Sequence, residues 1–334
     1  MRRNSSLGSV GFSARGGRSR RRHGGSSKLP YLILIGILIV LLGIAAFLWV
    51  HRSPAAHVSS VPASTETDSE NGVISLDNAS APADDSLEGV IAQAKLLADG
   101  YDYDGAINLL SSSTYASDES VTAAIDEYNA TKETLVRADP RKVTHVFFHT
   151  LIMDTSKAFD GDSREKGYNQ VMTTKDEFMK ILQSMYERGF VLVRLHDVAY
   201  EVTAEDGSRH FQEGDIMLPE GKKPFVMSQD DVCYYEYMDG DASRMIIGED
   251  GKPTNEMKMD DGSVSVGSYD LVPLLDDFIK EHPDFSYRGA KACIAFTGYN
   301  GILGYRTDSA YNTDEYKAEH PDFNFEEERA NAAK

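Results

Sequence analysis

The chain has 334 residues and a formal net charge of −19 at pH 7, but the charge is unevenly distributed. Residues 1–28 carry eight Lys or Arg and no acid, so the other 306 residues sum to −27. Because phosphate contacts need clustered cations, this acidic body excludes nucleic acid as a partner. Two cysteines are too few for a disulfide framework. Since free cysteine is usually buried, the composition predicts two buried thiols, with a single bridge as the alternative.

The N-terminal part of the chain predicts a basic cytoplasmic tail at 1–28 and a transmembrane helix at 29–51. Residues 32–50 carry no charge, and at 1.5 Å per residue such a helix spans a bilayer core of about 30 Å. Tyr31 and Trp49 lie where interfacial aromatics occur, and the positive charge before the span places the N-terminus in the cytoplasm. We therefore expect a single-pass protein of the cell membrane with an extracytoplasmic body. A cleaved signal peptide is the alternative, although its apolar region is usually only about 7–15 residues long.

Residues 52–84 and 85–139 differ in composition. The first segment is rich in Ser, Ala, Pro, Thr and Asp and has almost no large apolar residues, which predicts a disordered linker. The second has apolar residues at helical spacing, which predicts two short helices joined at Gly100 and a third from an N-cap at Ser117 to Arg137. The stretch AKLLADGYDYDGAINLL resembles one tetratricopeptide-type hairpin, but a single unit is too short for a stable array. This segment is therefore interpreted as a helical stub, a spacer or docking element, rather than a peptide-binding groove.

Residues 140–334 alternate between strand and helix patterns. Strands are expected at 143–148, 191–195, 225–229 and 290–297, helices at 174–188 and 271–280, and an inserted hairpin at 244–268. The 174–188 helix begins with a predicted capping box formed by Thr174 and Glu177. Strands separated by helices predict an α/β fold with a parallel sheet or a (β/α) barrel.

Two adjacent acids, Asp230 and Asp231, directly follow the short apolar strand at 225–229. The carboxyl end of a buried strand is where open and barrel α/β folds place their chemistry. Neighbouring carboxylates repel each other unless a cation or a shared proton compensates. The pair therefore predicts a site in which one acid binds a metal and the other transfers a proton.

The segment LPEGKKPFVMSQDDV resembles the first active-site motif of the polysaccharide deacetylases (carbohydrate esterase family 4), which usually reads Thr-Phe-Asp-Asp. Ser228 and Gln229 stand where the motif has Thr and Phe. The flanking segments HVFFHT, TTKDEFMKILQSMYERGFVLVRLHDV and YRGAKACIAFTGYNG follow the order of the family's strands and first helix. The resemblance covers roughly residues 142–312 and implies an incomplete (β/α) barrel of the polysaccharide deacetylase type.

This resemblance implies metal-dependent hydrolysis of N-acetyl groups on glycan amino sugars. Asp230 would be the general base and Asp231 a ligand of a divalent metal, usually zinc, which polarises the acetamide carbonyl and activates a bound water. A histidine acid would protonate the leaving amine. An extracytoplasmic enzyme of this kind would act on an N-acetylated polysaccharide, most simply peptidoglycan. Tyr234, Tyr235 and Tyr237 follow the acids and are either sugar-stacking faces or packing residues.

The family's other functional residues have no counterpart here. A catalytic zinc site needs about three protein ligands, and the family supplies two from a His-x-x-x-His motif downstream of the strand at 290–297. No such pair follows that strand in this chain, and the family's substrate-binding Arg next to a Pro is also missing. His149, at the end of the strand at 143–148, is a candidate substitute ligand, with a structural role as the alternative.

The C-terminal residues lead us to expect an interrupted domain. Asn324 and Glu327 are typical of a helix start, but the chain reaches Lys334 without a Gly, Asn or Pro to end the helix. Four strands are expected, where the family barrel has seven or eight. Residues 140–334 are therefore predicted to be a deacetylase-like domain truncated at its C-terminus, with open and unstable sheet edges. The alternative function is a non-catalytic, surface-displayed glycan-binding or scaffold remnant.

Overall fold

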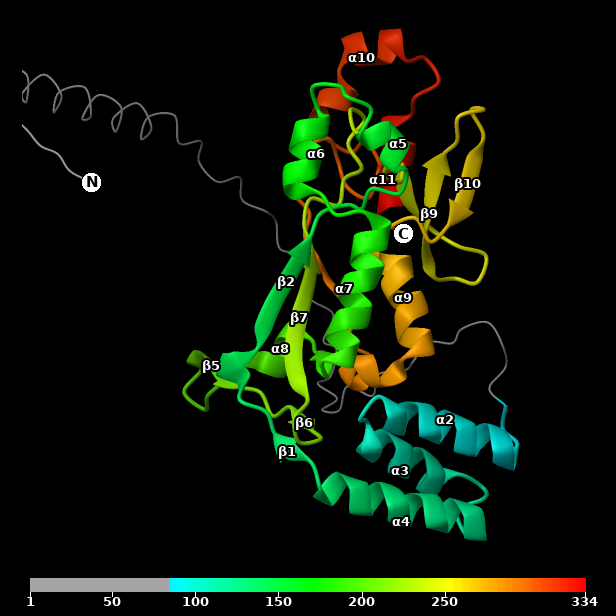
Figure 1. The fold of residues 1–334 in the computed structure, drawn as a ribbon, viewed down its shortest axis with the longest axis vertical. Coiled ribbons are helices and arrows are strands. Elements are labelled where there is room, and N and C mark those ends of the chain that lie inside the picture. The colour runs from blue at the N-terminus through cyan, green and yellow to red at the C-terminus, as the bar shows by residue number, and fades with distance from the viewer. Residues whose placement is uncertain (1–83) are drawn as a thin grey trace, which may run out of the picture. The chain divides into compact units, whose positions relative to one another are not determined.

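Residues 84–334 are described by a computed structural model (Figure 1) and lie within the unit Glu70–Lys334. The expected basic tail (1–28), the transmembrane helix (29–51) and nearly all of the expected linker (52–84) fall outside the described residues. From residue 84 onward, no helix is both long enough and apolar enough to cross a membrane.

Three helices open the described part of the chain: α2 (Leu87–Asp99), α3 (Tyr103–Ser112) and α4 (Glu119–Glu133). The first backbone N–H groups of a helix have no partner within it, and the side chains of Ser86, Asp102 and Asp118 accept hydrogen bonds from them. The three helices share a small core of short and branched side chains, which includes Val90, Ala94, Ala98, Ala106, Leu110 and Val121.

Helix α4 differs from the prediction at both ends. Asp118, rather than Ser117, accepts the capping hydrogen bond. The helix ends at Glu133, before the expected end, because Val136–Arg137 form strand β1 and pair antiparallel with β6 (Met217–Leu218). This long-range pairing outweighs the local helix propensity of the intervening residues.

The parallel sheet is organised around β7 (Lys223–Gln229), which is buried along all but its first residue. Such burial is typical of the central strand of a parallel sheet. One edge of β7 pairs with β2 (Thr144–Phe148), and the other pairs with β3 (Phe190–Leu192) near its start and with β11 (Cys293–Ile294) near its end. The fold is therefore mixed α/β with a parallel sheet, as predicted, and the described residues form no closed barrel.

Two of the expected strands are shorter in the structure. The strand expected at 191–195 ends at Leu192, because α8 (Leu195–Val198) begins soon afterwards. Only two residues of the strand expected at 290–297 pair with β7, since the chain then turns into an exposed loop. Both cysteines are free, and Cys293 in β11 is exposed, so the prediction of two buried thiols is wrong for this residue.

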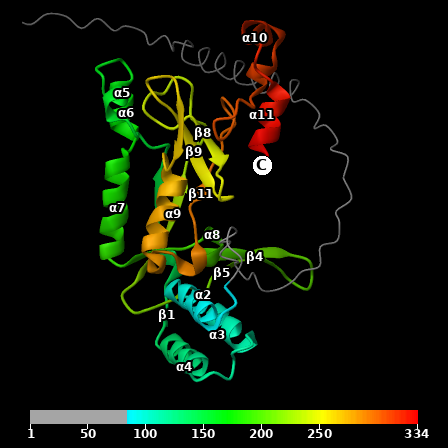
Figure 2. The ribbon, with the colours of Figure 1, turned by 90° about the vertical axis from the view of Figure 1, so that its right-hand side faces the viewer.

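One face of the parallel sheet is covered by α7 (Lys175–Glu187) and α9 (Leu271–Glu281), as Figures 1 and 2 show. Helix α7 begins with the predicted capping box between Thr174 and Glu177. The core between helices and sheet includes Phe148, Phe178, Leu182, Phe225, Met227, Leu274 and Phe278. Burial of one such side chain stabilises the fold by about 1.5–3 kcal/mol, so this layer holds β7 firmly in place.

The opposite face of the sheet is less completely covered. Phe148 packs under the helices, but its neighbour Phe147 is 57% exposed. Since alternate residues of a strand point to opposite faces, His145 and His149 lie on the same open face as Phe147. Ser228 of β7 pairs in register with Phe147 of β2, so the Ser228 side chain lies on this face as well.

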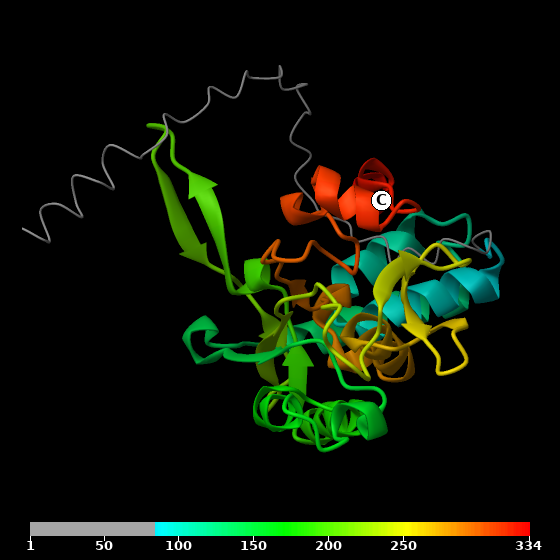
Figure 3. The ribbon, with the colours of Figure 1, turned by 90° about the horizontal axis from the view of Figure 1, so that it is seen from above.

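Besides the β1–β6 pair, two antiparallel sheets accompany the parallel one in the described residues. The hairpin of β4 (Ala199–Thr203) and β5 (Arg209–Glu213) projects away from the parallel sheet (Figure 3). The insertion expected as a hairpin at 244–268 has three strands, β8 (Arg244–Ile247), β9 (Pro253–Lys258) and β10 (Val264–Gly267). The remaining helices are α5 (Thr155–Ala158), α6 (Glu165–Val171), α10 (Asp314–Glu319) and α11 (Phe325–Ala332).

The turns of the 244–268 insertion and the start of α11 agree with the sequence patterns. Gly251 and Gly262 have φ values of 76° and 82°, which favour glycine because other residues are strained there. Asn324 accepts a hydrogen bond from the backbone N–H of Glu327, as expected of an N-cap.

Candidate functional site

The predicted acid pair lies at the carboxyl end of β7. The backbone N–H of Asp230 donates to the carbonyl of Phe148 at 2.7 Å, which continues the pairing of β7 with β2 by one residue. Asp231 has a φ of 54°, in the left-handed region that Asp tolerates better than most residues. The strand therefore ends in a sharp turn, and both acids remain partly exposed.

The Ser228 hydroxyl binds the carboxylate of Asp230, and His145 in turn contacts that hydroxyl. Ser228 Oγ donates to Asp230 Oδ1 at 3.2 Å, and His145 Nε2 lies 2.9 Å from the same hydroxyl. Because the hydroxyl has a single hydrogen, the ring nitrogen of His145 acts as the donor in this arrangement. Ser228, which replaces the Thr of the family motif, thus keeps a hydroxyl that orients Asp230. Sequence reasoning did not assign His145 to the site.

The described donor groups do not fit a three-ligand zinc site. Within residues 84–334, no three His, Cys, Asp or Glu side chains are grouped so that they could hold a metal ion. His145 and His149 are four residues apart, but on an extended strand this separation is about 13 Å. Zinc–nitrogen bonds are about 2.0–2.1 Å long, so these two histidines cannot share one ion. Asp231 supplies one partly exposed carboxylate.

The three tyrosines after the acid pair have different environments. Tyr234 is buried, whereas the ring of Tyr235 stacks on that of Tyr237 with centroids 5.1 Å apart and 13° between the planes. Tyr299 lies 5.8 Å from Tyr235. Tyr237 and Tyr299 are 51% and 61% exposed. We call Tyr235, Tyr237 and Tyr299 the aromatic platform. Tyr299 was not predicted from the sequence. The feature that could have indicated an exposed ring there is an aromatic residue between the turn glycines Gly298 and Gly301.

Arg306 joins the two loops that carry the aromatic platform. Its guanidinium donates to the carbonyl oxygens of Tyr234 at 2.6 Å, Cys233 at 3.3 Å and Asn300 at 3.4 Å. Its Nε lies 3.6 Å from Glu236 Oε1, and the Arg306 side chain is only 12% exposed. A buried fork of donors with several backbone partners fixes both loops in one arrangement.

The backbone of these two loops is unusually strained. Positive φ values occur at Asp231, Tyr234, Asn300 and Leu303, four of the six such non-glycine residues in the part of the chain that the structure describes. The N–H of Leu303 donates to the carbonyl of Val232 at 2.8 Å, so the loops also pair directly. Strain of this kind persists only where the surroundings determine the backbone, and it is concentrated at functional sites.

A buried carboxyl group, Asp270, underlies the site. Asp270 Oδ1 accepts from the backbone N–H of Leu151 at 2.9 Å, and Oδ2 accepts from Gln229 Nε2 at 2.7 Å and Tyr234 Oη at 2.6 Å. Asn255 Nδ2 donates to Tyr234 Oη at 2.9 Å. Burial raises the pKa of Asp270, and the hydrogen bonds oppose the rise. Gln229, which departs from the Phe of the family motif, thus ties the end of β7 to α9.

Asp241 is a second acid with a perturbed pKa. Burial of its carboxyl group raises the pKa to about 8, and the nearby charge of Asp270 adds to the rise. The residue as a whole is partly exposed, but its Oδ2 is buried and has no hydrogen-bond partner. At neutral pH this group therefore retains its proton.

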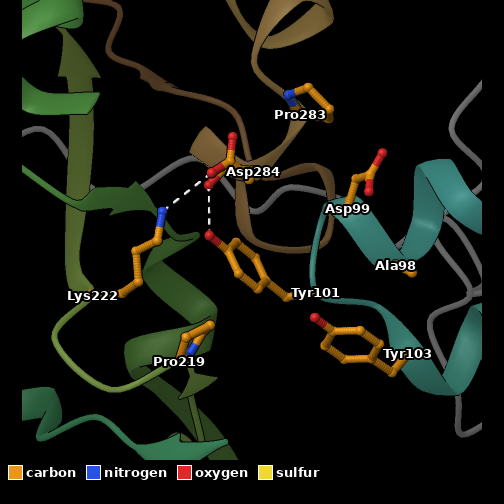
Figure 4. A pocket seen from close by; sticks show the side chains of 8 residues that line it. All are labelled: Ala98, Asp99, Tyr101, Tyr103, Pro219, Lys222, Pro283 and Asp284. Atoms are coloured by element: carbon orange, nitrogen blue, oxygen red, sulfur yellow. Dashed lines mark hydrogen bonds and ion pairs between the residues drawn. The ribbon is translucent and has the colours of Figure 1, made fainter. Parts of the chain in front are cut away.

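A cleft of about 420 Å³ lies at the other end of β7, next to Lys222. It is lined by Ala98, Asp99, Tyr101, Tyr103, Pro219, Lys222, Pro283 and Asp284. Figure 4 shows Tyr101 and Lys222 directed at Asp284: Tyr101 Oη donates to its carbonyl at 2.8 Å, and Lys222 Nζ lies 3.2 Å from its carboxylate. The cleft is lined by residues of the helical stub and by residues beside β7 and α9, and it is remote from the acid pair.

Comparison with known proteins finds no relative. No protein-family model, curated protein or solved structure matches this chain significantly. A functional assignment therefore depends on the acid pair, the aromatic platform and their surroundings.

Proposed function

We propose that the protein is a membrane-anchored, extracytoplasmic polysaccharide deacetylase that hydrolyses N-acetyl groups of glycan amino sugars, with peptidoglycan as the substrate. One observation carries this proposal: Asp230 and Asp231 follow the central strand of a parallel sheet at its carboxyl end. This is the end at which α/β folds place their active sites. The resemblance of the surrounding motif to the deacetylase family supports the reaction type and an incomplete (β/α) barrel.

Asp230 is the general base in this proposal. Ser228 donates to one carboxylate oxygen, Oδ1, and thereby orients the group, so that Oδ2 can accept the proton of an attacking water. A general base is identified first by its position and only then by its pKa. The Asp230 carboxylate is held in one orientation by Ser228 and remains partly exposed at the carboxyl end of the sheet. Asp231 is the proposed ligand of a divalent metal, zinc by the resemblance, and it is the one ligand that the proposal takes from residues 84–334.

Acetate release tests the proposal. The full-length protein, in detergent with added zinc chloride, is incubated with N-acetylated peptidoglycan, and acetate is measured enzymatically. We expect Asp230→Asn to lower the rate by about 10²–10⁴-fold, the usual contribution of a general base. Asp250→Asn, which changes an exposed acid in the β8–β9 turn, is the matched control and should leave the rate unchanged. If the parent protein releases no acetate with any added divalent metal, the proposed activity is wrong.

The second candidate is a non-catalytic glycan-binding protein. The exposed and stacked rings of the aromatic platform favour it, because aromatic faces bind ligands without any catalytic group. Glycan binding that neither requires a metal nor releases acetate would support this candidate over the enzyme.

A further inference from the structure

Two of the three rings of the aromatic platform are exposed to solvent, and packing within the protein does not explain why. Large apolar side chains are usually buried, and an exposed group of them marks a binding surface. Tyr237 is 51% exposed and Tyr299 is 61% exposed, yet both rings contact Tyr235. Phe296, which follows β11 before Tyr299, is also 51% exposed. The rings thus form a surface that is ordered without being covered.

The protein holds this surface rigidly. Arg306 donates to the carbonyl of Tyr234 on the first supporting loop and to that of Asn300 on the second. Tyr311 Oη donates at 2.8 Å to Oε2 of Glu236, which lies between Tyr235 and Tyr237 in the first loop. A Cβ at Gly301 would lie 2.0 Å from the carbonyl oxygen of Tyr305, so the second loop tolerates only glycine there. Rings fixed in advance lose little conformational entropy when a ligand binds.

The aromatic platform is next to the acid pair. Asp231 and Tyr235 are four residues apart across a turn in which the N–H of Cys233 donates to the carbonyl of Asp231 at 2.7 Å. The pKa of the Tyr235 hydroxyl is raised, chiefly by burial, and the charge of Asp231 contributes to the rise. The Tyr235 side of the platform therefore lies near Asp231.

The chemistry of the surroundings selects the ligand class. Asp231, Glu236 and Asp239 lie in the loop that carries two of the rings, and the chain beyond residue 28 has a charge of −27, which disfavours polyanions. A flat ligand with an apolar face and hydroxyl groups on its rim suits stacked tyrosines, whose rings are apolar and whose hydroxyls form hydrogen bonds. An uncharged pyranose ring such as N-acetylglucosamine has both properties.

We infer that Tyr235, Tyr237 and Tyr299 form a binding subsite for an uncharged N-acetylglucosamine-type ring of the glycan, adjacent to the acid pair. This inference deepens the proposed function and rests on it for the identity of the polymer. The ring that reacts lies at Asp230, and the subsite holds a neighbouring ring of the same chain.

Binding of chitohexaose, a hexamer of N-acetylglucosamine, tests the inference. Isothermal titration calorimetry is performed on the full-length protein in detergent, in an Asp230→Asn background that prevents turnover. We expect Tyr237→Ala and Tyr299→Ala each to weaken binding at least tenfold, which corresponds to about 1.4 kcal/mol. Tyr299→Phe should retain most of the affinity because it keeps the ring. Tyr200→Ala, which removes an exposed tyrosine from β4, is the matched control and should bind as the parent does.

The outcomes separate the subsite from the enzyme activity. Loss of affinity in Tyr299→Ala with an unchanged melting temperature supports the subsite, even if the parent releases no acetate. Equal affinity in the parent, Tyr237→Ala and Tyr299→Ala overturns it, as does the absence of chitohexaose binding, even if acetate is released. If both properties are present, Tyr299→Ala should raise KM for chitohexaose more than it lowers kcat, because the subsite binds substrate and transition state alike.

Discussion

Stacked tyrosines and an arginine occur at both ends of β7, but only at one end are the tyrosines covered. At the amino end, Tyr101 and Tyr287 stack with centroids 6.2 Å apart, and each is 5% exposed. Arg288 donates its backbone N–H to the carbonyl of Gly100 at 2.7 Å. At the carboxyl end, the aromatic platform is pinned by Arg306 but remains open to solvent.

We interpret this difference as a structural role for the tyrosines and arginine at the amino end and the proposed binding role for those at the carboxyl end. Tyr101 and Arg288 also have positive φ values, so backbone strain by itself does not distinguish the two ends. At the amino end the strained residues join the helical stub to the sheet, and the ring of Tyr101 becomes buried. At the carboxyl end they shape a surface beside two acids. In (β/α) folds the carboxyl ends of strands carry chemistry and the opposite end carries stability.

The largest expected effect is on stability at the amino end. Tyr101→Ala removes a buried ring and its hydrogen bond to Asp284, and should lower the free energy of unfolding by about 3–5 kcal/mol. Tyr237→Ala, at the exposed end, should change it by less than about 0.5 kcal/mol. Urea unfolding of both variants measures these two changes in the free energy of unfolding. If Tyr237→Ala is as destabilising as Tyr101→Ala, the aromatic platform is a packing element.

A smaller effect is expected from the arginine of the carboxyl end. Arg306→Gln leaves the carbonyls of Cys233, Tyr234 and Asn300 with fewer donors, which should destabilise the protein by about 1–3 kcal/mol. It should also loosen both platform loops, which hydrogen exchange of their backbone amides would detect. Arg209→Gln, at an exposed ion pair on the β4–β5 hairpin, serves as the control. Unchanged exchange in the platform loops would show that Arg306 does not hold them.

The smallest effect per pH unit is a pH dependence of stability that arises from Asp241. The folded protein holds a proton on Asp241 up to about pH 8, whereas an unfolded Asp loses it near pH 3.9. Stability contributed by this group is therefore present below about pH 4 and is lost as the pH rises to 8. The slope is at most about 1.4 kcal/mol per pH unit. Asp241→Asn should flatten this slope and raise stability at pH 8, as measured by urea unfolding at several pH values.

Asp322→Asn, which alters an exposed acid between α10 and α11, provides the control for that experiment. Its slope should equal that of the parent. A parent slope that Asp241→Asn leaves unaltered would contradict the assignment of the retained proton to Asp241.

Several parts of the fold follow from local sequence patterns. The capping box of Thr174 and Glu177, the turns at Gly251 and Gly262, and the buried strand before Asp230 are all present as predicted. Each depends on interactions within a few residues, such as side-chain capping or the freedom of glycine at positive φ. Such interactions are encoded in adjacent positions and can be recognised without knowledge of the tertiary structure.

Other parts could not be predicted in this way. The early end of α4 depends on a pairing partner, β6, about 80 residues further along the chain. The role of Gln229 depends on Asp270, which is distant in sequence but 2.7 Å away in the fold. Tyr234 is buried where its hydroxyl meets Asp270 and Asn255, which are distant in sequence, whereas Tyr237 remains exposed.

The sequence by itself determined where the acids lie, because a short buried strand followed by Asp230 and Asp231 is a local pattern. Only the tertiary structure decided what surrounds them: His145 on the Ser228 hydroxyl that binds Asp230, a buried Asp270 beneath, and three tyrosines from two loops at the side. The physical reason is that burial, hydrogen bonding and ring stacking act between residues that meet only after folding. Local propensity specifies the strand and its turn, but long-range packing brings the other groups to the acid pair.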